Sequence, residues 1–178
     1  MTPLHHRSVM TIRSETPADH EAVYDVNRRA FGQPDEADLV NSLRREVHPY
    51  VSLVAETEAE IVGHILFSPV STSSPNGSIP MMGLAPMAVL PEWQRQGVGT
   101  RLVQKGLGAC RRRGVAAVVV LGPPDYDPRF GFRPAVTFGL RSAYDVPEDA
   151  FMAMEIQEGA LQNVSGTVHY HPAFGAVE

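Results

Sequence analysis

The fold of this 178-residue chain is decided by residues 91–100, which read PEWQRQGVGT. Gly97 and Gly99 allow the backbone to approach a ligand closely, and apolar residues follow at helical spacing as far as residue 113. The first N–H groups of a helix have no partners within the helix, so this turn is suited to a phosphate. A tight packing turn without a ligand explains the two glycines alone equally well.

The spacing of this turn excludes two familiar phosphate-binding motifs. A dinucleotide-binding fingerprint requires a third glycine where this chain has Leu102. A P-loop requires glycine before lysine, whereas Lys105 precedes Gly106. The remaining pattern is Gln-x-x-Gly-x-Gly, from Gln94 to Gly99.

Segments typical of strands flank the expected helix. Residues 83–90 form one candidate, in which Pro86 cannot donate a backbone hydrogen bond and marks a bulge or an open edge. Residues 115–121 are continuously apolar, as in a central strand that is buried on both faces. Gly114 is the expected end of the helix between them. The order of strand, helix and strand predicts a βαβ unit.

The other elements complete one mixed domain with helices and strands. Residues 50–55 and 61–67 are expected to pair as antiparallel strands, because a short acidic turn separates them. We expect further strands at residues 11–13, 132–140 and 152–157, helices at 17–31 and 37–47, and a loop at 68–80.

Charge and cysteine content limit the functions open to the chain. It has 15 Lys+Arg against 20 Asp+Glu, a net charge of -5, which argues against general nucleic-acid binding. The single cysteine, Cys110, excludes an intramolecular disulfide and a thiolate zinc cage, and favours a cytoplasmic location. No apolar run is long enough to cross a bilayer, so we expect no membrane association.

The first nine residues differ from the rest of the chain. Residues 1–9 contain His5 and His6 but no apolar core, so we expect a flexible leader and no secretory signal. Residues 10–178 are expected to form a single domain, and Met10 is an alternative start to Met1.

The glycine turn and its surroundings resemble a known family. Residues 94–99 resemble the pyrophosphate-binding signature of the GCN5-related N-acetyltransferase (GNAT) superfamily, and residues 84–92 look like the strand before it. Tail motifs resemble the YhbS-like branch of bacterial predicted acetyltransferases, so that the likeness covers roughly residues 10 to 177. These motifs lie at residues 144–147, 151–155, 159–161 and 164–168. The resemblance implies an α/β fold, a three-layer α-β-α sandwich around a strongly twisted mixed sheet of about six or seven strands.

The resemblance also implies a reaction and a cofactor site. It implies transfer of the acetyl group of acetyl-CoA to a primary amine, and we expect no metal. Because no well-placed nucleophile appears for an acyl-enzyme, we expect the transfer to be direct. Backbone groups of Met87, Ala88 and Val89 are implied to hold the pantetheine arm, and an N–H near Met87 or Ala88 to polarise the thioester carbonyl. The implied pyrophosphate site consists of Gln94, Arg95, Gln96, Gly97, Val98, Gly99 and Thr100.

The sequence departs from the family pattern at the proton donor to the departing thiolate. In the superfamily a tyrosine commonly gives this proton, but Asp127 occupies its usual position four residues before Gly131, and Tyr126 stands one place earlier. A tyrosine hydroxyl can protonate a thiolate, whereas an ionised aspartate has no proton to give. We therefore choose Tyr126 as the acid over a purely packing role. Asp127, if it faces the acceptor, would bind the substrate ammonium.

The attacking amine must be neutral, so an acidic or imidazole group should line the acceptor side. Asp35, Glu36 and His64 are the candidates by expected position, with Phe31 as a further acceptor-side residue. First-turn acids of a helix are the simpler explanation of Asp35 and Glu36. A hydrogen-bonded histidine in a half-buried strand is the simpler explanation of His64.

Two other functions stay open. The departure at Asp127 is compatible with an acyl-CoA sensor or interaction module that does not turn over. A protein N-terminus or lysine is an alternative acceptor, whereas Phe31, Phe67 and Tyr126 around a closed pocket would favour a small molecule. Family members often pair, so a homodimer is open too. His169 and His171 share a strand face, but two ligands without a nearby carboxylate do not predict a metal site.

Overall fold

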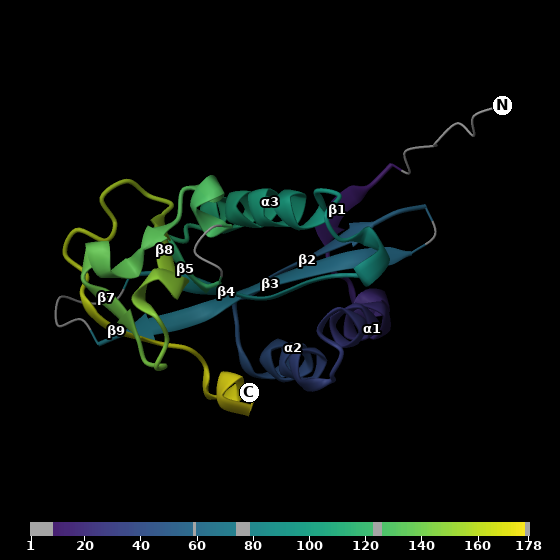
Figure 1. Ribbon diagram of the computed structural model, residues 1–178, viewed down its shortest axis with the longest axis horizontal. Coiled ribbons are helices and arrows are strands. Elements are labelled where there is room, and N and C mark those ends of the chain that lie inside the picture. The colour runs from purple at the N-terminus through teal and green to yellow at the C-terminus, as the bar shows by residue number, and fades with distance from the viewer. Residues whose placement is uncertain (1–8, 59, 74–78, 123–125, 177–178) are drawn as a thin grey trace.

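The computed structural model describes residues 9–58, 60–73, 79–122 and 126–176 (Figure 1). Most of the expected leader, with His5 and His6, lies outside them. The helices are α1 (His20–Phe31), α2 (Asp35–Glu46) and α3 (Val98–Arg112). The strands are β1 (Thr11–Ser14), β2 (Val51–Glu56), β3 (Ile61–Thr72), β4 (Met81–Val89), β5 (Ala117–Leu121), β6 (Arg133–Pro134), β7 (Leu140–Ser142), β8 (Phe151–Glu155) and β9 (Gly166–His169).

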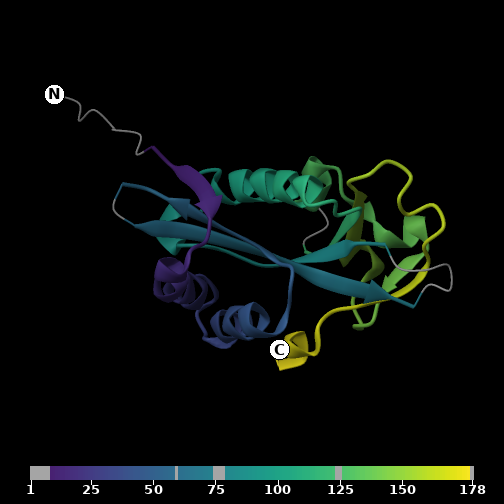
Figure 2. The same cartoon turned by 180° about the vertical axis from the view of Figure 1, so that it is seen from behind.

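These strands form one mixed sheet between two helical layers. The main path runs β1-β2-β3-β4-β5-β8-β6, in which β4 and β5 are parallel and the other neighbours are antiparallel. The helices α1 and α2 cover one face and α3 covers the other, as both views show (Figures 1 and 2). The expected three-layer α-β-α sandwich and the βαβ unit β4-α3-β5 are therefore confirmed.

Alternate residues of the central strands pack against opposite layers. Ile65 and Phe67 of β3 belong to the apolar cluster that contains the buried face of α3, and Leu66 belongs to the cluster that contains the buried faces of α1 and α2. This alternation follows from the two-residue period of a strand. Phe67 lies so close to α3 that a Cβ added at Gly106 would overlap its ring.

β4 leaves one of its two neighbours halfway along its length. It pairs with β5 only from Met81 to Leu84, while its pairing with β3 continues to Val89. Between the pairs Phe67–Leu84 and Ile65–Met87 the register shifts, so that Ala85 and Pro86 form a bulge. The sequence-based expectation for Pro86 is confirmed, and beyond Leu84 the two parallel strands are no longer paired.

Two expectations for the elements outside the βαβ unit were wrong. The expected loop at 68–80 begins later, because β3 continues to Thr72 and pairs there with β9; residues 74–78 lie outside the described part. The expected strand at 132–140 is a short strand and a 3-10 helix, Ala135–Phe138, before β7. Pro134 lacks an N–H for a ladder, and Gly139 reverses the chain at φ 77°. The sheet of the described residues therefore has nine strands, more than expected.

In the part of the chain that the structure describes, no helix is long and apolar enough to span a membrane.

Candidate active site

The glycine turn folds so that the start of α3 is open. Gly97 adopts the left-handed conformation, φ 85°, immediately before α3, and has no side chain to cap the helix. The N–H groups of Val98, Gly99 and Thr100 thus lie in the first turn of α3, where a helix attracts anions. Arg95 is also left-handed, with φ 62°. This conformation costs a non-glycine residue about 1 kcal/mol.

Two glutamine side chains hold this turn together. Gln94 Nε2 donates to the carbonyl oxygen of Val89 at 3.0 Å, and Gln96 Nε2 donates to that of Glu92 at 3.0 Å. These two residues, expected at the pyrophosphate, use their side chains inside the turn itself. Their side chains therefore hold the turn backbone in place and bring no charge to a ligand.

The turn borders a pocket of about 450 Å³, which we call the turn pocket. It is lined by residues 93–95 and 97–100, with Val89, Tyr126 and Arg129. Every expected pyrophosphate residue except Gln96 lines it. Arg95 and Arg129 bring two guanidinium groups to a pocket that already contains a helix N-terminus, so it is suited to a phosphate-bearing ligand.

A second cavity, of about 540 Å³, opens where β4 and β5 separate. We call it the split cavity. Residues 84–87 of β4 and residues 120–122 at the end of β5 form its floor, and side chains from all three α-helices and from the tail complete its walls. Met87, expected to hold the pantetheine arm, lines it. Ala88 is buried in the core, and Val89 lines the turn pocket.

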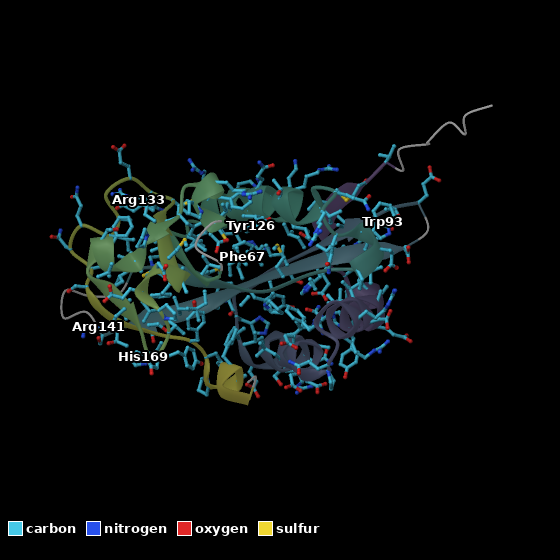
Figure 3. All side chains as sticks on the ribbon, viewed as in Figure 1. Phe67, Trp93, Tyr126, Arg133, Arg141 and His169 are labelled. Atoms are coloured by element: carbon cyan, nitrogen blue, oxygen red, sulfur yellow. The ribbon has the colours of Figure 1, made fainter. Side chains whose placement is uncertain are left out.

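Tyr126 lies where the two pockets meet. It lines both of them, and its hydroxyl oxygen is 3.4 Å from the position of a Cβ on Gly99. The Arg129 guanidinium lies 4.5 Å from the centre of its ring, and the Phe130 ring meets it edge-on at 5.4 Å. Figure 3 shows Tyr126 below α3, near the middle of the molecule. Its ring is thus held from two sides, with the hydroxyl at the junction.

Asp127 presents a buried carboxylate to the split cavity. Only 5% of the residue is exposed, and its Oδ2 has no hydrogen-bond partner among the described residues. Burial raises the pKa of this carboxyl group, and the nearby Arg129 opposes the rise. The carboxylate lies so close to Gly122 that a Cβ there would overlap Oδ2. A buried carboxyl group of this kind has the environment of a proton acceptor or a cation-binding group.

Only some of the other acceptor-side candidates line the split cavity. Phe31 and Glu36 line the split cavity, but Asp35 does not. Gln33 Nε2 donates to both carboxylate oxygens of Glu36, at 3.1 and 3.2 Å. Phe67, considered for a closed pocket, is in the core under α3 instead.

His64 is fully buried in β3 and lines neither pocket. Its Nε2 lies 2.9 Å from Ser52 Oγ and its Nδ1 lies 3.1 Å from Asn27 Nδ2. Asn27 Nδ2 also donates to the carbonyl oxygen of Val23, which fixes Nδ2 as the amide nitrogen facing His64. His64 Nδ1 therefore accepts from Asn27, and the proton lies on Nε2, which donates to Ser52 Oγ. Burial, with the positive charge of Arg44, lowers the pKa of His64 to about 3. A neutral imidazole with both nitrogens engaged links α1, β2 and β3.

Sequence reasoning missed three residues of the split cavity that come from the tail. These are Tyr144, Val146 and Phe174. Tyr144 and Val146 belong to a tail motif that was noticed without a role, whereas nothing in the sequence pointed to Phe174. Its 3-10 helix, Pro172–Ala176, packs against α2.

Ring contacts hold the tail on the sheet. Tyr170 lies 5.2 Å from Phe174 and 6.0 Å from Tyr144, measured between ring centres. Its Cε1 atom is 2.6 Å from where a Cβ on Gly83 would be, so the ring lies directly over that glycine of β4. His171 Nε2 also lies 3.5 Å from Glu46 at the end of α2. Within the described residues there is no group of three or more His, Cys, Asp or Glu side chains that could hold a metal.

This fold, with a parallel pair that splits beside an open helix start, defines a class of acetyltransferases. A model of the acetyltransferase (GNAT) domain family matches residues 11–135. The chain therefore belongs to the GNAT superfamily of N-acetyltransferases. The remaining residues, 136–178, include the part of the tail that lines the split cavity.

Two relatives indicate the branch of the superfamily that this chain resembles. The chain is 37% identical over 166 residues to the uncharacterized N-acetyltransferase YhbS of Escherichia coli K12, covering 93% of this chain and 98% of the relative. It is 38% identical over 169 residues to the uncharacterized N-acetyltransferase YjhQ of the same strain, covering 93% and 92%. The expected YhbS-like resemblance is confirmed.

Solved structures agree with this assignment. The crystal structure of E. coli YhbS in complex with CoA is 34% identical, has a TM-score of 0.87, and covers 94% of this chain and 93% of that one. A GNAT family acetyltransferase from Brucella melitensis in complex with acetyl-CoA is 31% identical with a TM-score of 0.77, covering 94% and 99%.

Proposed function

We propose that this acetyltransferase moves the acetyl group of acetyl-CoA directly onto a primary amine held in the split cavity. The observation that carries the proposal is the position of Tyr126, which lines both the turn pocket and the split cavity. A group at this junction can act on the sulfur of a ligand that extends from one pocket into the other. The relatives solved with CoA and with acetyl-CoA support this use of the pockets.

The residues present fit acetyl-CoA. In the proposal, the amides of Val98, Gly99 and Thr100 bind the diphosphate, with charge from Arg95 and Arg129. Beyond Leu84, residues 85–89 have no pairing with β5, so backbone groups on that edge are available to the amides of the pantetheine arm. An N–H near Met87 or Ala88 would stabilise the oxyanion that develops on the thioester carbonyl.

The reaction needs two proton transfers, one from the amine and one to the departing thiolate. The neutral amine forms the new C–N bond as the C–S bond breaks, the Asp127 carboxylate accepts the proton that the amine loses, and the Tyr126 hydroxyl gives one to the departing thiolate. Because burial raises the pKa of Asp127, its basicity moves toward that of the amine. Transfer is direct: Cys110 is buried within α3, where burial raises the pKa of its thiol to about 12, so it cannot serve as an acyl carrier.

Removal of the Tyr126 hydroxyl tests the proposal. Tyr126→Phe should lower kcat for amine acetylation about 100-fold, because general-acid catalysis is lost, and should change the Kd for acetyl-CoA less than about 2-fold. Thiol release and calorimetry measure the two quantities. Tyr24→Phe, the same change at a half-buried tyrosine of α1 whose hydroxyl donates to Asp38, is the control and should leave both unchanged.

Two outcomes would overturn the proposal. Acetyl-CoA binding without acetylation of any amine, unaltered by Tyr126→Phe, would favour an acyl-CoA sensor or interaction module. Acetylation of lysine peptides or protein N-termini in preference to small amines would favour a protein acetyltransferase. We further propose that residues 10–178 act as one domain, in the cytoplasm, as the single cysteine suggests.

A further inference from the structure

The charges that line the split cavity have one sign. Its lining includes two carboxylates, Asp127 and Glu36, and no lysine, arginine or histidine from the described residues. Elsewhere its surface is made mostly of aliphatic and aromatic side chains. A ligand that complements this cavity is therefore a cation with an apolar body.

The carboxylate of Asp127 needs such a cation. Its Oδ2 is buried beside Gly122, which lines the cavity with it, and has no hydrogen-bond partner among the described residues. A buried charge without a partner is strongly unfavourable, and an ammonium group would satisfy it. Glu36 differs, because Gln33 already donates to both of its oxygens. The structure therefore offers one deep position for one positive charge.

Aromatic rings surround the rest of the cavity. Phe31 comes from α1, Tyr144 from the segment after β7, and Phe174 from the tail helix that packs on α2. Phe31 is 41% exposed and Tyr144 is 38% exposed, although both are large aromatic residues that are usually covered. An apolar group between them would remove this surface from water.

These features exclude two kinds of amine. A polyamine or an aminoglycoside would carry its additional ammonium groups against walls that are mostly apolar, where the one other carboxylate of the described lining, Glu36, already accepts hydrogen bonds from Gln33. A lysine in a protein chain would bring polar backbone groups to the same surface. A cavity of about 540 Å³ is within the usual range for small molecules, roughly 300–1,000 Å³.

We propose that the acceptor is a small primary monoamine joined by a short chain to an aromatic or similarly bulky apolar body, with its amino group at Asp127 and its body between Phe31, Tyr144 and Phe174. This inference rests on the proposed function and names its substrate class. The tail thus determines specificity, although it lies beyond the residues that match the family model.

A panel of amines tests the class directly. The full chain is assayed by thiol release with 2-phenylethylamine, spermidine and a lysine-containing peptide. We expect kcat/KM for 2-phenylethylamine to exceed that for the other two at least about tenfold, which corresponds to one buried apolar group. A preference for spermidine or the peptide would overturn the inference. Absence of acetylation with every amine would instead overturn the proposed function, so the two failures are distinguishable.

Changes in the tail test the apolar wall. Phe174→Ala should raise KM for 2-phenylethylamine about tenfold, leaving kcat/KM for methylamine and the Kd for acetyl-CoA unchanged. Phe174→Leu, which keeps most of the apolar volume, should recover much of the loss. Phe138→Ala, a change at a tail phenylalanine that does not line the cavity, is the matched control. An equal KM for wild type and Phe174→Ala in folded protein would contradict the placement of the body.

Asp127→Asn tests the charge, because the amide keeps the shape of the carboxylate. It should lower kcat/KM for 2-phenylethylamine about 100-fold with acetyl-CoA affinity unchanged. The uncharged isostere 2-phenylethanol should inhibit wild type and variant equally, since it needs only the apolar walls. If Asp127→Asn lost inhibition by 2-phenylethanol to the same extent as it lost kcat/KM for 2-phenylethylamine, the variant would have disturbed the cavity shape, and the charge assignment would be wrong.

Discussion

The turn pocket and the split cavity are adjacent but are built in different ways. The turn pocket is lined mostly by one short segment, residues 93–95 and 97–100, and lies wholly within the residues that match the family model. The split cavity is lined by residues from all three α-helices, from β4 and β5, from the segment with Tyr126 and Asp127, and from the tail, and part of it lies beyond that match. The proposed cofactor site is thus local in sequence, whereas the proposed acceptor site depends on tertiary packing.

The largest expected effect comes from filling the junction of the two pockets. Gly99→Leu would direct a side chain toward Met87 and Tyr126, both 3.4 Å from the Cβ position. We expect affinity for acetyl-CoA to fall at least about 100-fold, or about 2.7 kcal/mol, as measured by calorimetry.

The same helix provides a matched control for this change. A Cβ at Gly108 would meet only the end of the Arg112 side chain, at 3.5 Å, so Gly108→Leu should bind acetyl-CoA normally. Unchanged binding by a folded Gly99→Leu variant would show that the two pockets do not hold one continuous ligand.

A smaller effect is expected on the free energy of unfolding, to which His64 contributes although it lines neither pocket. Its folded pKa of about 3 lies below its ordinary value of 6.5, so the unfolded chain binds a proton first as the pH falls. Stability from this residue is therefore intact above pH 6.5 and declines below it, by about 2 kcal/mol at pH 5. Chemical denaturation at several pH values measures this decline.

The variant His64→Gln tests the assignment of this acid sensitivity. It should be less stable than wild type at pH 7, because hydrogen bonds to Ser52 and Asn27 change, and this difference should shrink by about 2 kcal/mol at pH 5. The pH dependence of kcat should stay that of wild type. A shifted kinetic profile would connect His64 to the acceptor chemistry after all.

The smallest expected effect distinguishes the ligands of the two pockets. Arg129→Gln removes a charge from the turn pocket and the cation from the face of Tyr126. Affinity for acetyl-CoA should weaken about tenfold, more at low salt than at high salt, while KM for the amine stays constant. Arg133→Gln, which removes a guanidinium stacked on Phe138, is the control and should alter neither quantity. A higher KM for the amine would mean that Arg129 serves the acceptor instead.

Local patterns predicted the elements around the cofactor site. Gly97 directly precedes α3 and Gly114 follows two residues after its end, and both adopt the left-handed conformation that glycine favours. Pro86 marks the bulge where β4 and β5 separate, since a proline cannot complete a ladder. These features depend on neighbouring residues, so they could be identified without a structure.

The acceptor side could not be identified in the same way. β3 is longer than its sequence indicated because Ser71 and Thr72 pair with β9, about a hundred residues later in the chain. Phe174 has no local motif, and only the packing of its helix on α2 brings it to the cavity. His64 and Asp127 are both buried and titratable, but only their tertiary surroundings show that Asp127 lines a cavity and His64 does not.

The ring of Tyr170 over Gly83 gives the tail a fixed seat on the strand that continues into the floor of the split cavity. The tail also pairs with the sheet through β8 on β5 and β9 on β3 and packs on α2, so this ring is one of several fixed contacts. Exchange of residues 136–176 between homologous enzymes that keep these pairings and the Tyr170–Gly83 contact is therefore expected to change the acceptor and to leave the thioester machinery intact.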